Sequence, residues 1–125
     1  MPIDLVFHED TRRVVMTVGE GTRGPDLGRL VNEAVRARPA LADWDWINDL
    51  RHPVEDSSAD DIPKLAEVFD PVSTRPTWTV LVSHDPGLAM WAKVMDHQFK
   101  FRRHLTASSI EAAMALLDHK RAGAG

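Results

Sequence analysis

The chain of 125 residues contains no cysteine. It therefore forms no disulfide framework and offers neither a thiol nucleophile nor thiolate ligands for a metal. No run approaches the ~20 apolar residues of a membrane span, and the first residues lack the basic-then-apolar pattern of a secretory leader. We expect a cytoplasmic protein that is stabilised by packing alone.

Positive charge is also scarce. Lysine and arginine total 15 against 19 aspartates and glutamates, and the formal net charge is -4 at pH 7. This balance argues against nucleic acid as a partner. A hydrophobic content of 43% suits one core. We expect a single domain over residues 1–120, followed by a flexible tail over 121–125 that frays.

Hydrophobic periodicity predicts an α/β fold. Two β-rich runs, 3–8 and 13–18, flank a turn and predict a hairpin. Strand and helix patterns then alternate, which implies parallel strands joined by right-handed crossovers and a mixed sheet with four helices. The remaining predicted strands are 44–50, 77–83 and 99–105, and the predicted helices are 27–38, 60–69, 88–95 and 108–117.

Three local signals refine this pattern. Pro63 is tolerated only in a first turn, so the second helix should begin at Asp60 or Asp61. Ser108 and Glu111 form a capping-box pattern before the last helix. In the run Phe99–Leu105 apolar residues alternate with Lys100, Arg102 and His104, which predicts a half-exposed strand near a sheet edge.

The segment from Asp49 to Ala59, D-L-R-H-P-V-E-D-S-S-A, joins a predicted buried strand to the second helix. It resembles the switch loop of STAS domains, the bacterial SpoIIAA-like anti-sigma-factor antagonists, in which a strand ending in D-L-S precedes a D-S-S-G turn. The final strand and helix, with T-A-S-S-I-E-A-A-M-A-L-L, also look like the end of that family. The resemblance implies a SpoIIAA-like mixed sheet with an opening hairpin.

In that family a partner kinase phosphorylates the second serine of the motif, which aligns with Ser58 and has Ser57 as its neighbour. A hydroxyl at a helix start suits such a switch, because phosphate adds charge at the positive end of the helix dipole. The alternative reading is that both serines only cap backbone amides.

The resemblance thus implies a non-catalytic interaction module whose protein partner is an anti-sigma factor or a related serine kinase. Loops at strand ends commonly carry binding residues. We therefore expect the partner to contact the loop between Asp49 and Asp61. Its candidate contact residues are Asp49, Arg51, His52, Asp56, Asp60 and Asp61.

Two further function classes remain open. A divergent STAS/SEC14 branch of the family suggests a small apolar, lipid-like ligand, for which tryptophans and methionines would supply the lining, although such residues are usually core. That lining would comprise Trp44, Trp46, Trp78 and Trp91, with Met90 and Met95.

The best case for an enzyme is a group of acids and imidazoles at two strand ends, which could hold a metal or move protons. The group comprises Asp49, His52, Asp56, His84 and Asp85. No catalytic or phosphate-binding motif accompanies it. We expect no enzymatic activity and no cofactor.

Overall fold

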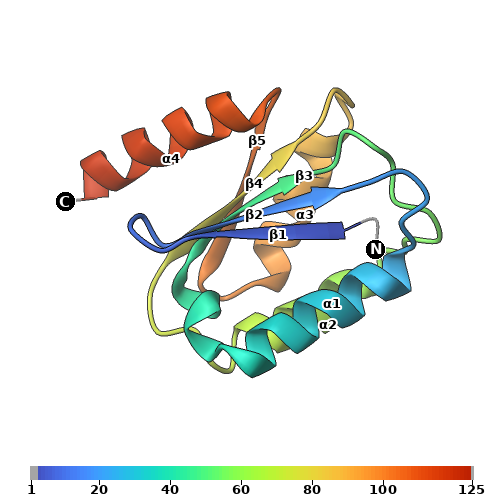
Figure 1. The fold of residues 1–125 in the computed structure, drawn as a ribbon, viewed down its shortest axis with the longest axis horizontal. Helices are drawn as coiled ribbons and strands as arrows, with labels where there is room; N and C mark the ends of the chain where they lie inside the picture. Colours follow the sequence, from blue (N-terminus) through green and yellow to red (C-terminus); the bar gives the residue numbers. More distant parts are fainter. Residues whose placement is uncertain (1–2, 125) are drawn as a thin grey trace.

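The computed structural model describes residues 3–124 as a five-stranded sheet with helices on both faces (Figure 1). The strands lie in chain order; β1 is antiparallel to β2, and β2 to β5 are parallel. The predicted α/β fold is confirmed. The strands are β1 (Ile3–His8), β2 (Arg13–Val18), β3 (Asp45–Asp49), β4 (Thr77–Val82) and β5 (Arg102–Ala107). The helices are α1 (Gly24–Ala37), the short 3-10 helix η1 (Pro39–Asp43), α2 (Asp61–Phe69), α3 (Leu88–Gln98) and α4 (Ile110–Ala124).

The sheet separates two hydrophobic cores. Helices α1, α2 and α3 cover one face and α4 covers the other (Figure 1). Successive strand residues point to opposite faces, so Trp46 belongs to the core under α1 and α2 whereas Ile47 belongs to the core under α4. Parallel strands covered on both faces read as continuous apolar runs, as β4 does. Within residues 3–124 no helix is long and apolar enough to cross a membrane.

The predicted edge strand 99–105 needs correction. β5 does lie at the sheet edge but begins at Arg102, because Phe99 ends α3 and is buried. Arg102 and His104, expected to be exposed, retain only 2% and 7% of their accessible surface. Helix α3 packs along β5 and buries the face on which His104 lies.

Two predictions, for the start of the last helix and for the C-terminal tail, also need correction. The serine that caps α4 is Ser109, whose Oγ accepts a hydrogen bond from the Ala112 amide (3.0 Å), so the predicted box starting at Ser108 is not formed. The predicted tail 121–125 begins too early, because α4 continues to Ala124 and Arg121 pairs with Asp45. Gly125 lies outside the described residues.

Candidate functional site

The candidate loop begins at the carboxyl end of β3, where Asp49 is held by its neighbour. The Asp49 carboxylate accepts hydrogen bonds from the Arg51 amide (3.2 Å), Nε (2.9 Å) and Nη2 (2.7 Å). These bonds lower the pKa of Asp49 and raise the pKa of Arg51. The Asp49 side chain is only 6% exposed. Asp49 therefore shapes the start of the loop and offers little surface to a partner.

The middle of the loop is braced against the start of α1. The Glu55 amide donates to the Thr22 carbonyl (2.9 Å), and the Gly24 amide donates to the Glu55 carbonyl (2.7 Å). Arg23 Nε donates to Asp56 Oδ2 (2.8 Å), while Asp56 adopts a left-handed backbone with φ of 54°. These contacts fix the backbone of the loop from behind.

Glycine at position 24 makes this close approach feasible. A Cβ at Gly24 would lie 3.0 Å from both the Asp56 carbonyl oxygen and the Ser57 Cα. Any side chain there would have to displace the loop backbone. The close packing of the loop against α1 therefore requires glycine at position 24.

Ser58 caps the turn that opens α2, which begins at Asp61 as predicted. Its Oγ accepts a hydrogen bond from the Asp60 amide (3.2 Å), and its own amide donates to Asp61 Oδ2 (2.9 Å). This reciprocal arrangement resembles a capping box. The Ser57 hydroxyl donates instead to the Val54 carbonyl (3.3 Å), and both serines are exposed. The N-cap of α2 is Asp60, which makes no side-chain cap bond, so the exposed Ser58 side chain holds the turn that precedes the helix.

The acid and imidazole residues proposed for catalysis do not gather into a metal site. Asp49 is bound by Arg51 and Asp56 by Arg23. Asp85 Oδ1 accepts a hydrogen bond from the Gly87 amide (2.9 Å), which makes it a cap of the turn before α3. Over residues 3–124, no group of three or more histidine, aspartate or glutamate side chains is placed to hold a metal. His52 and Asp60 are exposed.

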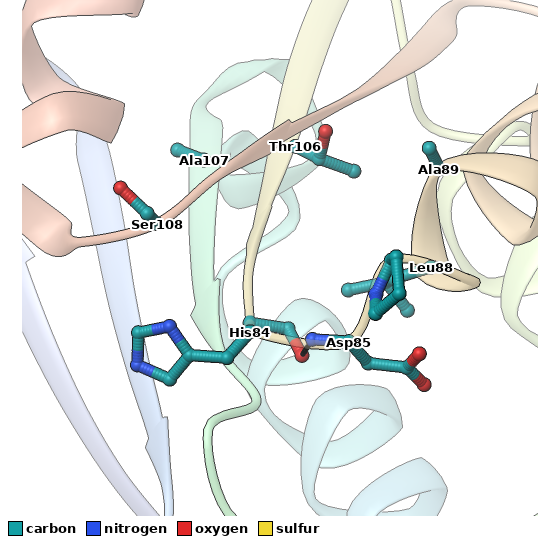
Figure 2. A pocket seen from close by; sticks show the side chains of 9 residues that line it. His84, Asp85, Leu88, Ala89, Thr106, Ala107 and Ser108 are labelled. Atoms are coloured by element: carbon teal, nitrogen blue, oxygen red, sulfur yellow. Dashed lines mark hydrogen bonds between the residues drawn. The ribbon is translucent and has the colours of Figure 1, made fainter.

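An open hollow of about 290 Å³ lies where β4 and β5 end. Figure 2 shows the His84 and Asp85 side chains pointing to opposite sides of this hollow, so they form no acid–base pair. The hollow was not predicted, because it depends on β4 and β5 ending side by side. Its lining residues are Ser83, His84, Asp85, Pro86, Leu88, Ala89, Thr106, Ala107 and Ser108.

The four tryptophans are not brought together. Trp44 and Trp46 are buried in the core under α1 and α2, and Trp46 Nε1 donates to the Leu41 carbonyl (2.9 Å). Trp78 packs against the core under α4, on the opposite face of the sheet, while Trp91 is 39% exposed on α3. The four tryptophans therefore do not line one common cavity.

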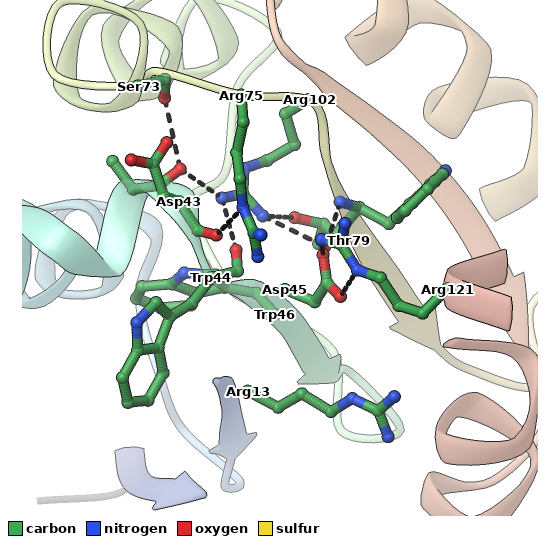
Figure 3. Close-up of polar contacts among 12 residues, drawn as sticks. Arg13, Asp43, Trp44, Asp45, Trp46, Ser73, Arg75, Thr79, Arg102 and Arg121 are labelled. Carbon is green, nitrogen blue, oxygen red and sulfur yellow. Dashed lines mark hydrogen bonds and ion pairs between the residues drawn. The ribbon is translucent and has the colours of Figure 1, made fainter. Parts of the chain in front are cut away.

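Two ion pairs that join the amino ends of β2 and β3 to α4 were not predicted, and in each of them only the strand residue, Arg13 or Asp45, is buried (Figure 3). Asp45 is 2% exposed and accepts two hydrogen bonds from Arg121 of α4, from Nε (2.9 Å) and Nη2 (2.6 Å). Arg13 of β2 pairs with Asp118 of α4 (2.7 Å). The available signal was an aspartate between two tryptophans in a predicted buried strand. Both pairs join α4 to the sheet.

Comparison with protein-family models, curated proteins and solved structures finds no match for this chain. What the protein does must therefore be inferred from its own residues.

Proposed function

We propose that this protein is a non-catalytic interaction module related to STAS and SpoIIAA-like antagonists. It binds a protein partner, an anti-sigma factor or related serine kinase, through the loop from Asp49 to Asp61, and Ser58 is where a phosphate regulates that binding. The observation that carries the proposal is the exposed Ser58 hydroxyl at the turn opening α2. The element order, with a hairpin followed by alternating strands and helices, supports the relationship.

A phosphate on Ser58 would alter the local hydrogen bonds. The Asp61 carboxylate already accepts the Ser58 amide, and the Ser58 hydroxyl already accepts the Asp60 amide. A phosphoryl group replacing the hydroxyl proton adds about -1.5 to -2 charges. It would compete for these two amides and would repel the carboxylates of Asp60 and Asp61. The turn over residues 58–61 would therefore rearrange.

The rest of the loop would stay in place during this change. Its contacts with Thr22 and Gly24 are made by the backbone of Glu55, and the Arg23–Asp56 pair lies before Ser58. A charge at Ser58 therefore changes the surface of the loop and leaves the fold intact.

The test compares Ser58→Asp with Ser58→Ala, using the partner captured by the immobilised wild-type protein. Both variants should melt close to wild type, since a carboxylate can still cap amides at a helix start. Ser58→Asp should weaken binding at least about tenfold relative to Ser58→Ala, because an interface that desolvates an unpaired charge is penalised.

Ser57→Asp is the matched control, since the Ser57 hydroxyl donates to the Val54 carbonyl and takes no part in the hydrogen bonds of the turn between Ser58 and Asp61. It should weaken binding less than Ser58→Asp. Equal affinities for Ser58→Ala and Ser58→Asp, with a partner footprint outside residues 49–61, would make Ser58 an ordinary cap and refute the proposal.

A further inference from the structure

The two edges of the sheet differ in how they are protected. An edge strand exposes backbone amides and carbonyls to which another chain can add a strand. At the β5 edge the His104 amide is already bound, because it donates to Asp96 Oδ1 of α3 (2.6 Å). Strand β1 forms the other edge (Figure 1), and over residues 3–124 it pairs only with β2. The outer edge of β1 is therefore open to pairing.

Strand β1 lacks the usual devices that prevent such pairing. Natural edge strands are commonly protected by proline, by lysine or by a β-bulge. This strand contains no proline and no lysine, and its register with β2 runs without interruption from Ile3 to His8. Two of its apolar side chains are exposed, Val6 by 46% and Phe7 by 41%. A regular edge strand with exposed apolar side chains is a site for strand addition.

The sequence of β1 is complementary to itself. A twofold axis perpendicular to the sheet pairs two copies of the strand antiparallel and places one residue opposite its own copy. With Val6 on the axis, Asp4 of each copy lies opposite His8 of the other. Leu5 then lies opposite Phe7. At both ends of the pair a carboxylate thus meets an imidazole that can donate a hydrogen bond, and between them apolar side chains meet.

The two neighbouring registers lack this match. If Leu5 lies on the axis, Asp4 comes opposite Val6. If Phe7 lies on the axis, Asp4 comes opposite Asp10, and like charges meet. Only the register centred on Val6 gives every polar residue of β1 a polar partner.

The charges next to β1 do not oppose this pairing. Two acidic and two basic residues follow the strand in the hairpin: Glu9, Asp10, Arg12 and Arg13. Glu9 is bound by Arg38 through two hydrogen bonds (2.6 and 2.7 Å), and Arg13 is paired with Asp118 (2.7 Å). The other two have opposite charges and lie in the turn, outside the paired residues 4–8. The charges of the hairpin therefore balance.

We infer that a second copy of this chain adds to the β1 edge. The two β1 strands pair antiparallel about a twofold axis at Val6, so that the two five-stranded sheets become continuous. Asp4 of each copy lies against His8 of the other. This self-association goes beyond the loop-mediated function and does not depend on Ser58.

Sedimentation equilibrium of the full chain over a concentration series tests the dimer. Wild type should show a monomer–dimer equilibrium. Val6→Lys should raise the dissociation constant at least about tenfold, because it places two ammonium groups opposite each other on the axis. Met90→Glu is the matched control, since it puts a charge at another exposed apolar side chain, on α3. This variant and Ser58→Asp should leave the equilibrium unchanged.

Two outcomes of this experiment would overturn the inference. One is a wild-type chain that remains monomeric up to its solubility limit. The other is a dimer that Met90→Glu dissociates and Val6→Lys does not, because the copies would then meet at α3. Melting curves check that each variant is folded.

Disulfide cross-linking tests the register, because the chain has no cysteine of its own. Directly opposite residues have Cβ atoms about 4.5–5.5 Å apart, so Val6→Cys should link two copies under mild oxidation. Asp4→Cys alone should not, since the two copies of residue 4 would lie roughly 13 Å apart along the strands. An equimolar mixture of Asp4→Cys and His8→Cys should cross-link. If Asp4→Cys alone links as fast as Val6→Cys, or if neither links, this register is wrong.

Discussion

His104 is a histidine whose surroundings hold it uncharged. Burial lowers its pKa from the ordinary 6.5 to about 4, although the hydrogen bond to Asp96 acts in the opposite direction. Between these two pH values the unfolded chain binds a proton that the folded chain does not bind. The free energy of unfolding should therefore be fully retained above about pH 6.5 and fall as the pH drops towards 4, by roughly 3 kcal/mol from this residue.

Urea unfolding at several pH values measures this effect. His104→Asn keeps a donor near the position of Nδ1 but does not titrate, so its stability should change little between pH 6.5 and 4. His97→Asn, at an exposed position of α3, is the control and should keep the wild-type pH dependence. The pKa values of Asp49 and Asp43 are lowered, so the stability that these two carboxylates contribute is lost only at a pH below the range in which His104 acts. A variant His104→Asn with the wild-type slope would show that another group titrates.

Arg102 shows why the surroundings of a single side chain are harder to predict from the sequence than the position of a helix or strand. Its alternation with Phe101 predicted an outward side chain, yet its guanidinium donates to the Ala42 (3.0 Å), Trp44 (2.8 Å) and Trp78 (3.1 Å) carbonyls. Burial lowers its pKa to about 9, which leaves it protonated at neutral pH. These oxygens come from segments far apart in the chain. Local pattern carries no information about such acceptors, so burial of the charge could not be foreseen.

At the level of elements the sequence was more informative. The hairpin strands 3–8 and 13–18 and the start of α2 agree with prediction, because alternation, turn residues and Pro63 act locally. The start of β5 was misplaced because Phe99 is buried as the end of a helix rather than as part of a strand. The placement of Ser57 and Ser58 was likewise predictable, whereas the bracing of their loop by Thr22 and Gly24 required the tertiary structure.

Gly24 and Gly28 give α1 two glycines with opposite predicted responses to alanine. A Cβ at Gly24 would approach the loop backbone at 3.0 Å, so Gly24→Ala should destabilise by about 1–3 kcal/mol through overpacking and should weaken partner binding. At Gly28 a Cβ meets no atom within 4 Å. Gly28→Ala should stabilise by about 0.5–1 kcal/mol, as expected inside a helix. Urea unfolding compares them, and equal effects would show that the loop is not held by α1.

The stability of the whole molecule depends on α4, which packs on the second face of the sheet. An ion pair whose two side chains are unequally buried joins α4 to β3. The Asp45 side chain is 2% exposed, and that of Arg121 is 30% exposed. Arg121→Met should cost about 3–5 kcal/mol, because it leaves a buried carboxylate unpaired. Asp45→Asn should cost less, since Arg121 can be hydrated and the amide oxygen can still accept from the Trp78 amide.

The double variant Asp45→Asn, Arg121→Met decides between a charge effect and a packing effect. If the cost of Arg121→Met comes from the unpaired charge of Asp45, the double variant should be more stable than Arg121→Met alone. Amide hydrogen exchange in α4 should then be slower in the double variant than in Arg121→Met. Simple addition of the two costs would instead mean that Arg121 acts through packing on Trp78, whose ring lies 4.7 Å from its guanidinium carbon. The exposed Asp26–Arg29 pair serves as a control, and its removal should change stability by no more than about 0.5 kcal/mol.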